Sequence, residues 1–238
     1  LTPVPITGSL SDVNAVMLKD KDAASASAVL KYSTNERGTA ALLRNTEMLK
    51  KLAGDERLGT YREILPKILH MKENRAGLTV VETVVSGTEG RQFLREGGDA
   101  GAMMAAASDT LADIHKRTSE IRLLDEPWAE KWIDAPIDVV AASQNAFAAK
   151  ESRLAVLERL RHDLRDVFVG RQASLGLGHG DIWPGNLFYA NSDGQSGGTH
   201  LSGLIDWDTA RTDALAASDT CHLRLTFKME QQGEELGP

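Results

Sequence analysis

The chain has 238 residues, of which 42% are hydrophobic and 26% charged, and its formal net charge is -7. These values are ordinary for a soluble globular protein, and the length allows one large domain or two small lobes that share a cleft. The acidic balance disfavours a general nucleic-acid or anionic-membrane binder, because such proteins need a basic surface. The single cysteine excludes an internal disulfide and suits a reducing compartment.

Several other classes of protein are disfavoured by motifs that the sequence lacks. No basic segment followed by an apolar run opens the chain, and no apolar stretch approaches the length of a membrane span. We therefore expect a cytoplasmic protein. No His/Cys cluster has zinc spacing, and no Gly-x-Ser-x-Gly elbow supports hydrolase chemistry.

The first third of the chain predicts short strands around one helix. Residues 13–18 and 28–32 are short apolar runs bounded by polar turns, which is typical of strands. Residues 38–53 carry apolar side chains at helical spacing. Residues 64–71 and 78–85 predict two further strands, and the second is rich in β-branched residues, which indicates burial.

After these strands the pattern changes to helix. Residues 86–90 read Ser-Gly-Thr-Glu-Gly, a linker-like break. Residues 99–117 predict a helix from their apolar spacing, and residues 136–170 predict one or two more, in part because they are rich in alanine. We therefore expect an α+β chain with a small strand-rich part, residues 1–85, and a larger, mainly helical part, residues 86–238.

Two short segments late in the chain carry the strongest chemical signal. One reads His-Gly-Asp-Ile-Trp-Pro-Gly-Asn over residues 179–186, and the other reads Ile-Asp-Trp-Asp over residues 205–208. Between them, residues 186–190 and 201–205 predict the two strands of a hairpin. The segments therefore stand at the two feet of one hairpin, and their polar side chains are expected to meet.

These polar side chains suit the separate tasks of a phosphoryl transfer. Asp181 lies in a loop from which a carboxylate can accept a proton from a substrate hydroxyl, so we expect it to be catalytic. Asn186 and Asp206 offer amide and carboxylate oxygens of the kind that Mg²⁺ prefers, so we expect them to bind metal. Taken alone, Asp181 also suits a loop cap, and Asp206 a turn at a strand end.

The two segments resemble those of the aminoglycoside phosphotransferase and choline kinase family, APH-type phosphotransferases whose fold is kinase-like. The resemblance covers roughly residues 5–220 and implies a two-lobe protein-kinase-like fold. The N-terminal nucleotide-binding lobe, residues 1–85, would be a small antiparallel sheet with one helix. The C-terminal catalytic lobe, residues 86–238, would be larger and mainly helical. The nucleotide would lie in the cleft between the lobes.

The resemblance also implies nucleotide-binding roles in the first lobe. Lys31 resembles the strand lysine that contacts the phosphates, and Glu47 resembles the helix glutamate that pairs with that lysine. Ser9 and Ser11 lie in the segment that would cover the phosphates, although it lacks the Gly-x-Gly-x-x-Gly pattern of protein kinases. Each residue also has a simpler interpretation. Lys31 would be a solvated lysine on an edge strand, Glu47 a solvated helix residue, and the segment of Ser9 and Ser11 a plain turn.

Glu82, Thr83 and Val84 resemble the family's hinge, the segment that holds the adenine. They would contact the base through backbone groups. The family uses the histidine that corresponds to His179 structurally, so we expect a supporting hydrogen bond rather than a base.

Two aspartates keep open roles. Asp208 stands where many relatives have glycine, and it would face the acceptor, brace the loop or contact metal. Asp219 would either brace the catalytic loop or be a solvated helix residue. Only residues 209–238 follow the second motif, whereas in relatives longer tails form much of the acceptor pocket. Either the pocket comes largely from residues 99–178, or the sequence is truncated.

We therefore predict a Mg²⁺-dependent small-molecule kinase that uses ATP or GTP. The acceptor would be a hydroxyl of a sugar, an aminosugar, an aminoglycoside-like compound or an amino alcohol. The alternative is a pseudokinase, a nucleotide-binding scaffold with weak catalysis. A protein kinase is disfavoured, because the triplet at residues 179–181 reads HGD rather than HRD and no Ala-Pro-Glu follows Asp206.

Overall fold

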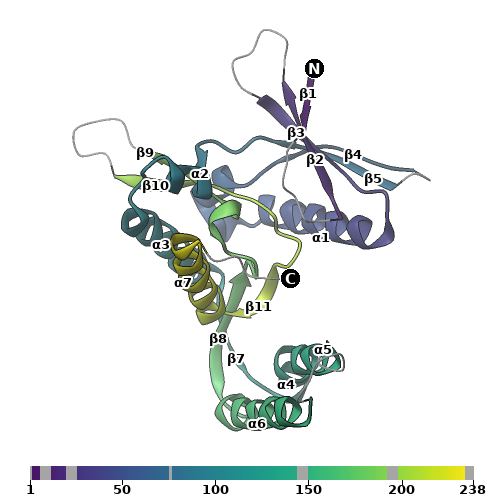
Figure 1. The fold of residues 1–238 in the computed structure, drawn as a ribbon, viewed down its shortest axis with the longest axis vertical. Coiled ribbons are helices and arrows are strands. Elements are labelled where there is room, and N and C mark those ends of the chain that lie inside the picture. The colour runs from purple at the N-terminus through teal and green to yellow at the C-terminus, as the bar shows by residue number, and fades with distance from the viewer. Residues whose placement is uncertain are drawn as a thin grey trace. The chain divides into compact units, whose positions relative to one another are not determined.

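In the computed structural model, the chain forms two compact units. The first unit comprises residues 1–119 and 176–238, and the second comprises residues 120–175 (Figure 1). The structure describes residues 2–5, 12–19, 26–74, 77–143, 150–191 and 198–233. None of the described helices combines the length and apolar character that a bilayer crossing requires.

An antiparallel five-stranded sheet with the order β1-β2-β3-β5-β4 forms one part of the first unit. Its strands are β1 (Thr2–Pro5), β2 (Asn14–Lys19), β3 (Ala26–Tyr32), β4 (Ile68–Asn74) and β5 (Gly77–Thr83). Along β5, Leu78, Val80 and Glu82 are buried in alternation, so a carboxylate shares the inward face with two apolar side chains. Such a charge requires a partner inside the protein.

Helix α1 (Glu36–Ala53) packs against this sheet (Figure 1). It begins at Asn35, whose side chain accepts a hydrogen bond from the Gly38 amide at 2.7 Å, an N-cap of the usual kind. Its buried stripe contains Leu42, which packs with apolar residues of β5, and also the polar residue Asn45. A 3-10 helix, Glu56–Ile64, follows α1.

The two motifs, residues 179–186 and 205–208, lie in the rest of the first unit. A hairpin of β9 (Leu187–Asn191) and β10 (Thr199–Leu204) forms a small antiparallel sheet with β6 (Thr88–Glu89). The flanking elements are α2 (Gly90–Arg95), α3 (Ala100–Thr118), the single 3-10 turn Pro184–Asn186, β11 (Arg211–Leu215) and α7 (Ala216–Gln232). Helix α3 packs against both α7 and β10.

One hydrophobic core joins these elements to α1. Leu49 and Leu52 of α1, Met103 of α3 and Phe227 of α7 belong to the same buried cluster as the hairpin residues and Trp207. The five-stranded sheet and the hairpin therefore lie in one packed body, because α1 contributes to both cores.

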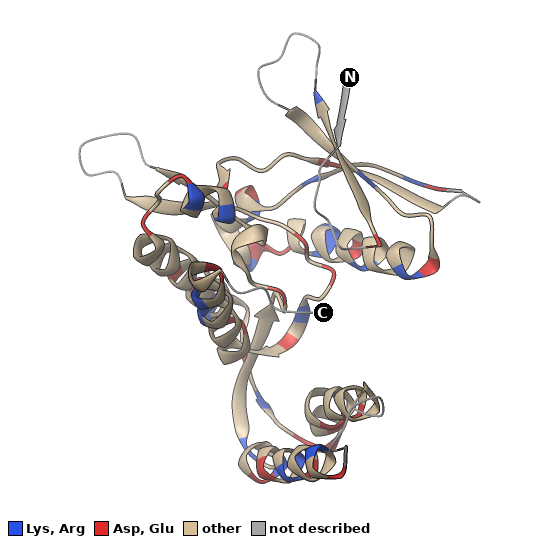
Figure 2. Cartoon of the chain, viewed as in Figure 1, with Lys and Arg blue, Asp and Glu red and all other residues tan. Residues whose placement is uncertain are grey.

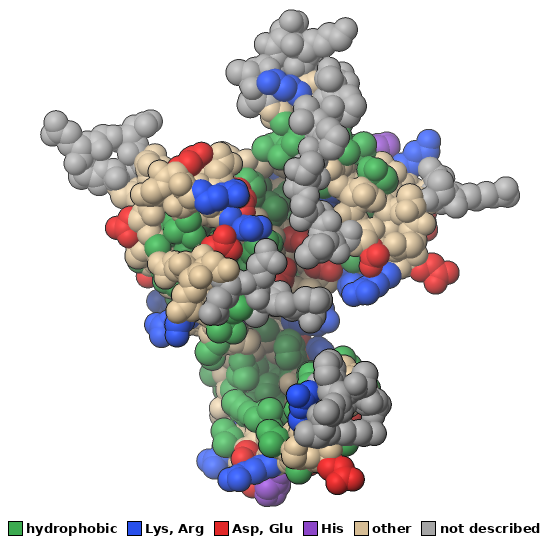
Figure 3. All heavy atoms as spheres, in the orientation of Figure 1, with side chains coloured by type: hydrophobic (Ala, Val, Ile, Leu, Met, Phe, Trp, Pro, Cys, Tyr) green, Lys and Arg blue, Asp and Glu red, His purple; other side chains and the backbone are tan. Residues whose placement is uncertain are grey.

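The second unit is a helical insertion on a two-stranded base. Strand β7 (Glu120–Leu123) pairs antiparallel with the first residues of β8 (Gln172–Gly178). Between the strands lie α4 (Glu126–Ala129), a π-helical turn (Glu130–Asp134), α5 (Ala135–Ser143) and α6 (Lys150–Phe168). Arg161 and Arg165 of α6 both pair with Asp134. Exposed apolar side chains are frequent here (Figure 3). Val139 and Val156 are two of them.

The sequence-based fold class is confirmed, since an antiparallel sheet with one helix precedes a mainly helical part. The strand expected over residues 64–71 is wrong in its first half, because Leu65 and Pro66 are buried before β4 begins and proline has no N–H for a sheet. Strands β7, β8 and β11 were not anticipated. The lobe boundary at residue 85 stays a prediction, since it does not coincide with the division into units.

The core between α1 and the sheet can be tested with neighbouring leucines. Leu42 is 2% exposed and Leu43 is 37% exposed. We expect Leu42→Ala to lower the free energy of unfolding by about 2–5 kcal/mol, because it opens a cavity against Leu78 and Val80. Leu43→Ala should cost less than about 1 kcal/mol. Urea unfolding of both variants measures the difference, and equal losses would contradict this account of the core.

Candidate active site

The loop that carries Asp181 is held by a buried carboxylate from α7. Asp219 is 2% exposed, and its Oδ2 and Oδ1 accept hydrogen bonds from the backbone amides of His179 at 2.8 Å and Gly180 at 2.9 Å. His115 at the end of α3 brings its Nε2 within 3.1 Å of Asp219 Oδ2. Asp219 therefore braces the loop of Asp181 and is not the solvated helix residue that the sequence also allowed.

Folding lowers the pKa of Asp219. Burial alone would raise this pKa, but the hydrogen bonds from His115, Gly180 and His179 outweigh burial and hold it below its ordinary value. Asp219 is therefore a carboxylate at neutral pH, and it accepts from donors that converge from two elements.

Residues 179 and 180 then aim Asp181. Gly180 has φ +81°, and an added Cβ would lie 2.9 Å from the carbonyl oxygen of Thr209, so a side chain is excluded on both counts. His179 is fully buried, and its Nε2 lies 2.9 Å from the Ile205 carbonyl oxygen. Burial lowers the pKa of His179, which favours the neutral ring. The expected supporting hydrogen bond of His179 is thus present.

Asn186 contacts Asp181 directly. Its Nδ2 donates to the Asp181 carbonyl oxygen at 2.9 Å and to the carboxylate Oδ2 at 3.0 Å. Its backbone oxygen accepts from the Ile205 amide at 3.0 Å, which ties the foot of β9 to the foot of β10. With Nδ2 turned to Asp181, the amide oxygen of Asn186 is the atom available to a cation.

Asp206 follows at the foot of β10. Among the described non-glycine residues it alone has a positive φ, 69°, a conformation that aspartate tolerates better than most and that often marks functional sites. The next residue, Trp207, is buried. Its ring packs 4.5 Å from that of His179, and its Nε1 donates to the Leu204 carbonyl at 3.0 Å. The two motifs therefore lock together through their aromatic residues.

The carboxylates of the two motifs share one electrostatic environment. Burial raises the pKa of Asp208, and the neighbouring charges of Asp206 and Asp181 raise it further, while Arg44 and Lys31 oppose the shift. Figure 2 shows acidic residues on the loops between the five-stranded sheet and helices α3 and α7. A concentration of negative charge that raises a pKa in this way suits a bound cation.

The donor set fits magnesium better than a metal caged by protein alone. Among the described residues, no three His, Cys, Asp or Glu side chains group closely enough to hold an ion. Asn186 and Asp206 would supply one amide and one carboxylate oxygen. Mg²⁺ at phosphate-transfer sites is held by one or two such groups together with water and substrate phosphates.

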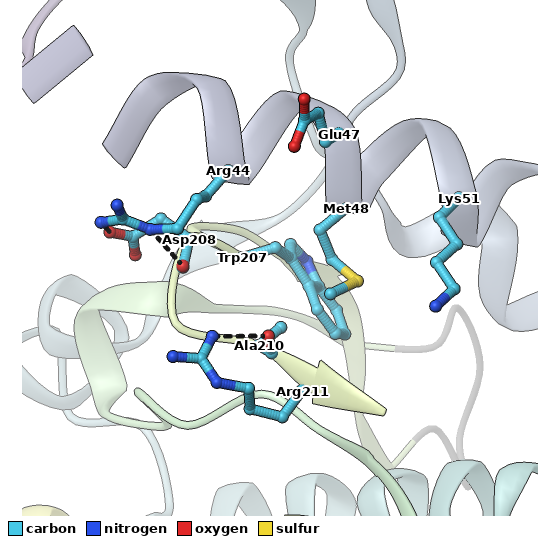
Figure 4. A pocket seen from close by; sticks show the side chains of 8 residues that line it. All are labelled: Arg44, Glu47, Met48, Lys51, Trp207, Asp208, Ala210 and Arg211. Carbon is cyan, nitrogen blue, oxygen red and sulfur yellow. Dashed lines mark hydrogen bonds and ion pairs between the residues drawn. The ribbon is translucent and has the colours of Figure 1, made fainter. Parts of the chain in front are cut away.

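Lys31 has a different partner from the one expected. Its Nζ lies 3.0 Å from Oε2 of Glu82 on β5, and the two side chains are 14% and 2% exposed. Glu47, the expected partner, is exposed on α1 and lines a cavity of about 260 Å³ with Arg44, Lys51 and Asp208 (Figure 4). The physical reason is the phase of the helix, because the buried stripe passes through Asn45 and leaves Glu47 outside it.

The remaining nucleotide residues lie in different settings. Ser9 and Ser11 fall outside the described residues. Thr83 is engaged with Lys67, since its amide donates to the Lys67 oxygen and its Oγ1 accepts from the Lys67 amide, both at 2.9 Å. Val84 follows the end of β5 and is partly buried. Of the three residues expected to form the hinge, Val84 is thus the one whose backbone lies outside the strand.

Asp208 takes a bracing position rather than an isolated one. Arg44 of α1 donates through Nε to the Asp208 carbonyl oxygen at 3.2 Å, and its guanidinium lies 3.7 Å from the Asp208 carboxylate (Figure 4). Of the three roles that the sequence left open, this contact favours bracing of the loop.

Comparison with known proteins decides the family. A family model described as the phosphotransferase enzyme family, APH, matches residues 11–236. The chain belongs to the phosphotransferase enzyme family. The small-molecule kinase class expected from the sequence is thereby confirmed for this phosphotransferase. No curated protein matches the sequence.

Solved structures with this fold are distant in sequence. Aminoglycoside phosphotransferase APH(3'')-Id from Streptomyces rimosus is 16% identical, with a TM-score of 0.58 over 97% of this phosphotransferase and 83% of that chain. The GDP complex of aminoglycoside 2'-phosphotransferase-IIIa is 15% identical, with a TM-score of 0.65 over 98% and 77%. Other structures similar to this phosphotransferase hold GDP with kanamycin, or ADP with streptomycin.

The contacts of Asn45 and the ion pair of Glu82 were not predicted from the sequence, although the sequence contains a signal for each. Asn45 lies three residues after Leu42 and four before Leu49, so it is a polar residue within an apolar helix stripe. Glu82 continues the alternation of Leu78 and Val80 in the same way. A polar residue at a core position indicates a buried hydrogen-bond partner.

The brace on the loop of Asp181 can be tested with Asp219→Asn. Asparagine keeps one acceptor oxygen but turns an amide N–H toward a backbone N–H, which leaves a buried donor unpaired. We expect the free energy of unfolding to fall by about 1–3 kcal/mol at neutral pH. Chemical denaturation of wild type and variant measures this loss.

The same pair of proteins gives a pH test. The pKa of Asp219 is lower in the folded chain than its ordinary value of 3.8, so its contribution is complete above that pH and is lost as the pH falls through the folded-state value. The stability difference between wild type and Asp219→Asn should stay constant from about pH 8 to about pH 5 and narrow below 3.8. A difference that widens with acid would contradict the assignment.

Proposed function

We propose that this phosphotransferase moves the γ-phosphate of ATP or GTP, with Mg²⁺, to a hydroxyl of a small molecule. The observation that supports this most directly is the 3.0 Å contact between Asn186 Nδ2 and Asp181 Oδ2. This contact puts the expected base next to an expected metal ligand. The β9–β10 hairpin carries Asp206 at its other foot.

In the proposed reaction, Asp181 orients the acceptor hydroxyl and takes its proton. The hydroxyl oxygen forms a bond to the γ-phosphorus, the bond from that phosphorus to the bridging oxygen breaks, and the nucleoside diphosphate leaves. The amide of Asn186 holds the Asp181 carboxylate in one orientation during proton transfer. Lys31 neutralises charge on the nucleotide phosphates.

Asn186 and Asp206 would hold the magnesium ion, which neutralises phosphate charge when it is bound. The backbone near Val84 would receive the base of the nucleotide. Similar structures hold either GDP or ADP, so both nucleotides belong in any assay. Nucleoside triphosphates and Mg²⁺ are both available in the cytoplasm, the compartment that the single cysteine also suits.

For the acceptor we propose an aminoglycoside-like compound, an aminosugar, a sugar or an amino alcohol. Support comes from similar structures, one a complex with GDP and kanamycin and the other a complex with ADP and streptomycin. The net charge of -7 favours a cationic acceptor over a nucleic acid. A panel of these compounds with radiolabelled ATP or GTP tests the proposal, because label must appear on the small molecule.

Asp181→Ala should lower kcat by about 10²–10⁴-fold, because the hydroxyl loses its proton acceptor. The affinity for ADP or GDP should stay near that of the wild type. Steady-state transfer assays and calorimetric titration measure the two quantities. Asp109→Asn, on the exposed face of α3, is the control for a lost aspartate charge. Near-normal turnover in Asp181→Ala would contradict the base assignment.

Asp206→Ala should remove the dependence of nucleotide binding on magnesium, because the metal loses its carboxylate. Titration of ADP or GDP at zero and saturating Mg²⁺ measures this dependence. Unchanged magnesium-dependent affinity would argue against the metal role. If the wild type binds nucleotide with Mg²⁺ but transfers no phosphate to any acceptor, the pseudokinase scaffold becomes the better description.

A further inference from the structure

A buried hydrogen-bonded path connects Lys31 with the loop of Asp206. Lys31 pairs with Oε2 of Glu82, and the other oxygen of Glu82, Oε1, accepts from Asn45 Nδ2 at 2.8 Å. The Asn45 oxygen, Oδ1, in turn accepts from the backbone amide of Trp207 at 2.8 Å. Every step of the path is a short contact, and both Glu82 and Asn45 are only 2% exposed.

The central position of this path needs a side chain that both donates and accepts, and an amide does so. Asn45 donates on one side to a carboxylate and accepts on the other from a peptide N–H. A carboxylate there would face the carboxylate of Glu82, and an apolar side chain would leave a buried oxygen and a buried N–H unpaired. The reverse orientation of the amide would create two repulsive contacts, so its two neighbours fix which way it points.

The path ends beside the expected metal ligand. Trp207 directly follows Asp206, whose positive φ already requires support from its surroundings. Arg44, the residue before Asn45, holds the Asp208 backbone from the same helix at 3.2 Å. Two successive residues of α1 therefore hold the two residues that follow Asp206, and Figure 4 shows Arg44 against Asp208 at this contact.

We infer that Asn45 is a positioning residue that couples phosphate binding at Lys31 to metal binding at Asp206. The inference rests on the function proposed above for those two residues. When nucleotide phosphates hold Lys31, they fix Glu82, Asn45 and the Trp207 amide in the arrangement that the metal needs. The reverse also holds, because a coupling between two binding sites is reciprocal.

The experiment compares nucleotide affinity with and without metal. The coupling factor is the ratio of ADP or GDP affinities at saturating and at zero Mg²⁺, measured by calorimetry on the full chain. We expect Asn45→Leu to lower this factor by about 3- to 30-fold. Lys50→Gln, an exposed change on the same helix, should leave it at the wild-type value.

An exchange of the two polar groups keeps the test decisive if Asn45→Leu does not fold. Asn45→Asp places two carboxylates together, and Glu82→Gln removes the anionic partner of Lys31, so each alone should lower the coupling factor. The double variant Asn45→Asp/Glu82→Gln restores one donor and one acceptor at each step. It should recover most of the factor that the single variants lose.

A purely structural role would give a different pattern. The exchange would then restore the melting temperature, while the coupling factor would equal that of the wild type in every variant that folds. That result would overturn the inference and leave the proposed function intact. A wild-type chain that binds no nucleotide, or whose nucleotide binding ignores Mg²⁺, would instead overturn the proposed function and the inference together.

Discussion

The antiparallel register between β9 and β10 is the constraint on which the site depends. Leu187 pairs with Leu204, so the residues just outside the hairpin, Asn186 and Ile205, face each other and share a 3.0 Å backbone hydrogen bond. A slip of one residue would turn the buried leucines outward and separate the two polar feet. The apolar packing that fixes this register therefore also fixes the distance between the two expected metal ligands.

A second set of contacts attaches the loop of Asp181 to helices α3 and α7. Asp219 on α7 receives two backbone amides from the loop and one imidazole from α3. These bonds satisfy loop N–H groups that no strand or helix could satisfy, and they do so inside the core. Residues of α3 and α7 thus help to determine where Asp181 lies.

The sequence predicted the parts of this protein that local patterns encode. The hairpin, α1 and α3 follow from apolar spacing, and the two motifs follow from the close combination of oxygen ligands. The partner of Lys31 could not be predicted in the same way, because β3 and β5 become neighbours only through the sheet. The resemblance pointed to Glu47 as that partner. On α1, however, Asn45 lies on the buried face and Glu47, two residues later, does not. Strands β7 and β8 were missed for the same reason, since they pair across about fifty intervening residues.

Because Glu82 lies on β5 and not on α1, a movement of α1 would not separate it from Lys31. Lys31 and Glu82 belong to adjacent strands that are hydrogen-bonded along their length, so the sheet itself keeps them together. If the carboxylate that pairs with Lys31 were on the helix, an outward movement of the helix would break the ion pair. Here the ion pair would stay in place, and the movement would break the two contacts of Asn45, with the Trp207 amide and with Glu82. An effector that acts through this helix would therefore change the link between the two ends of the path, and it would leave the ion pair between Lys31 and Glu82 intact.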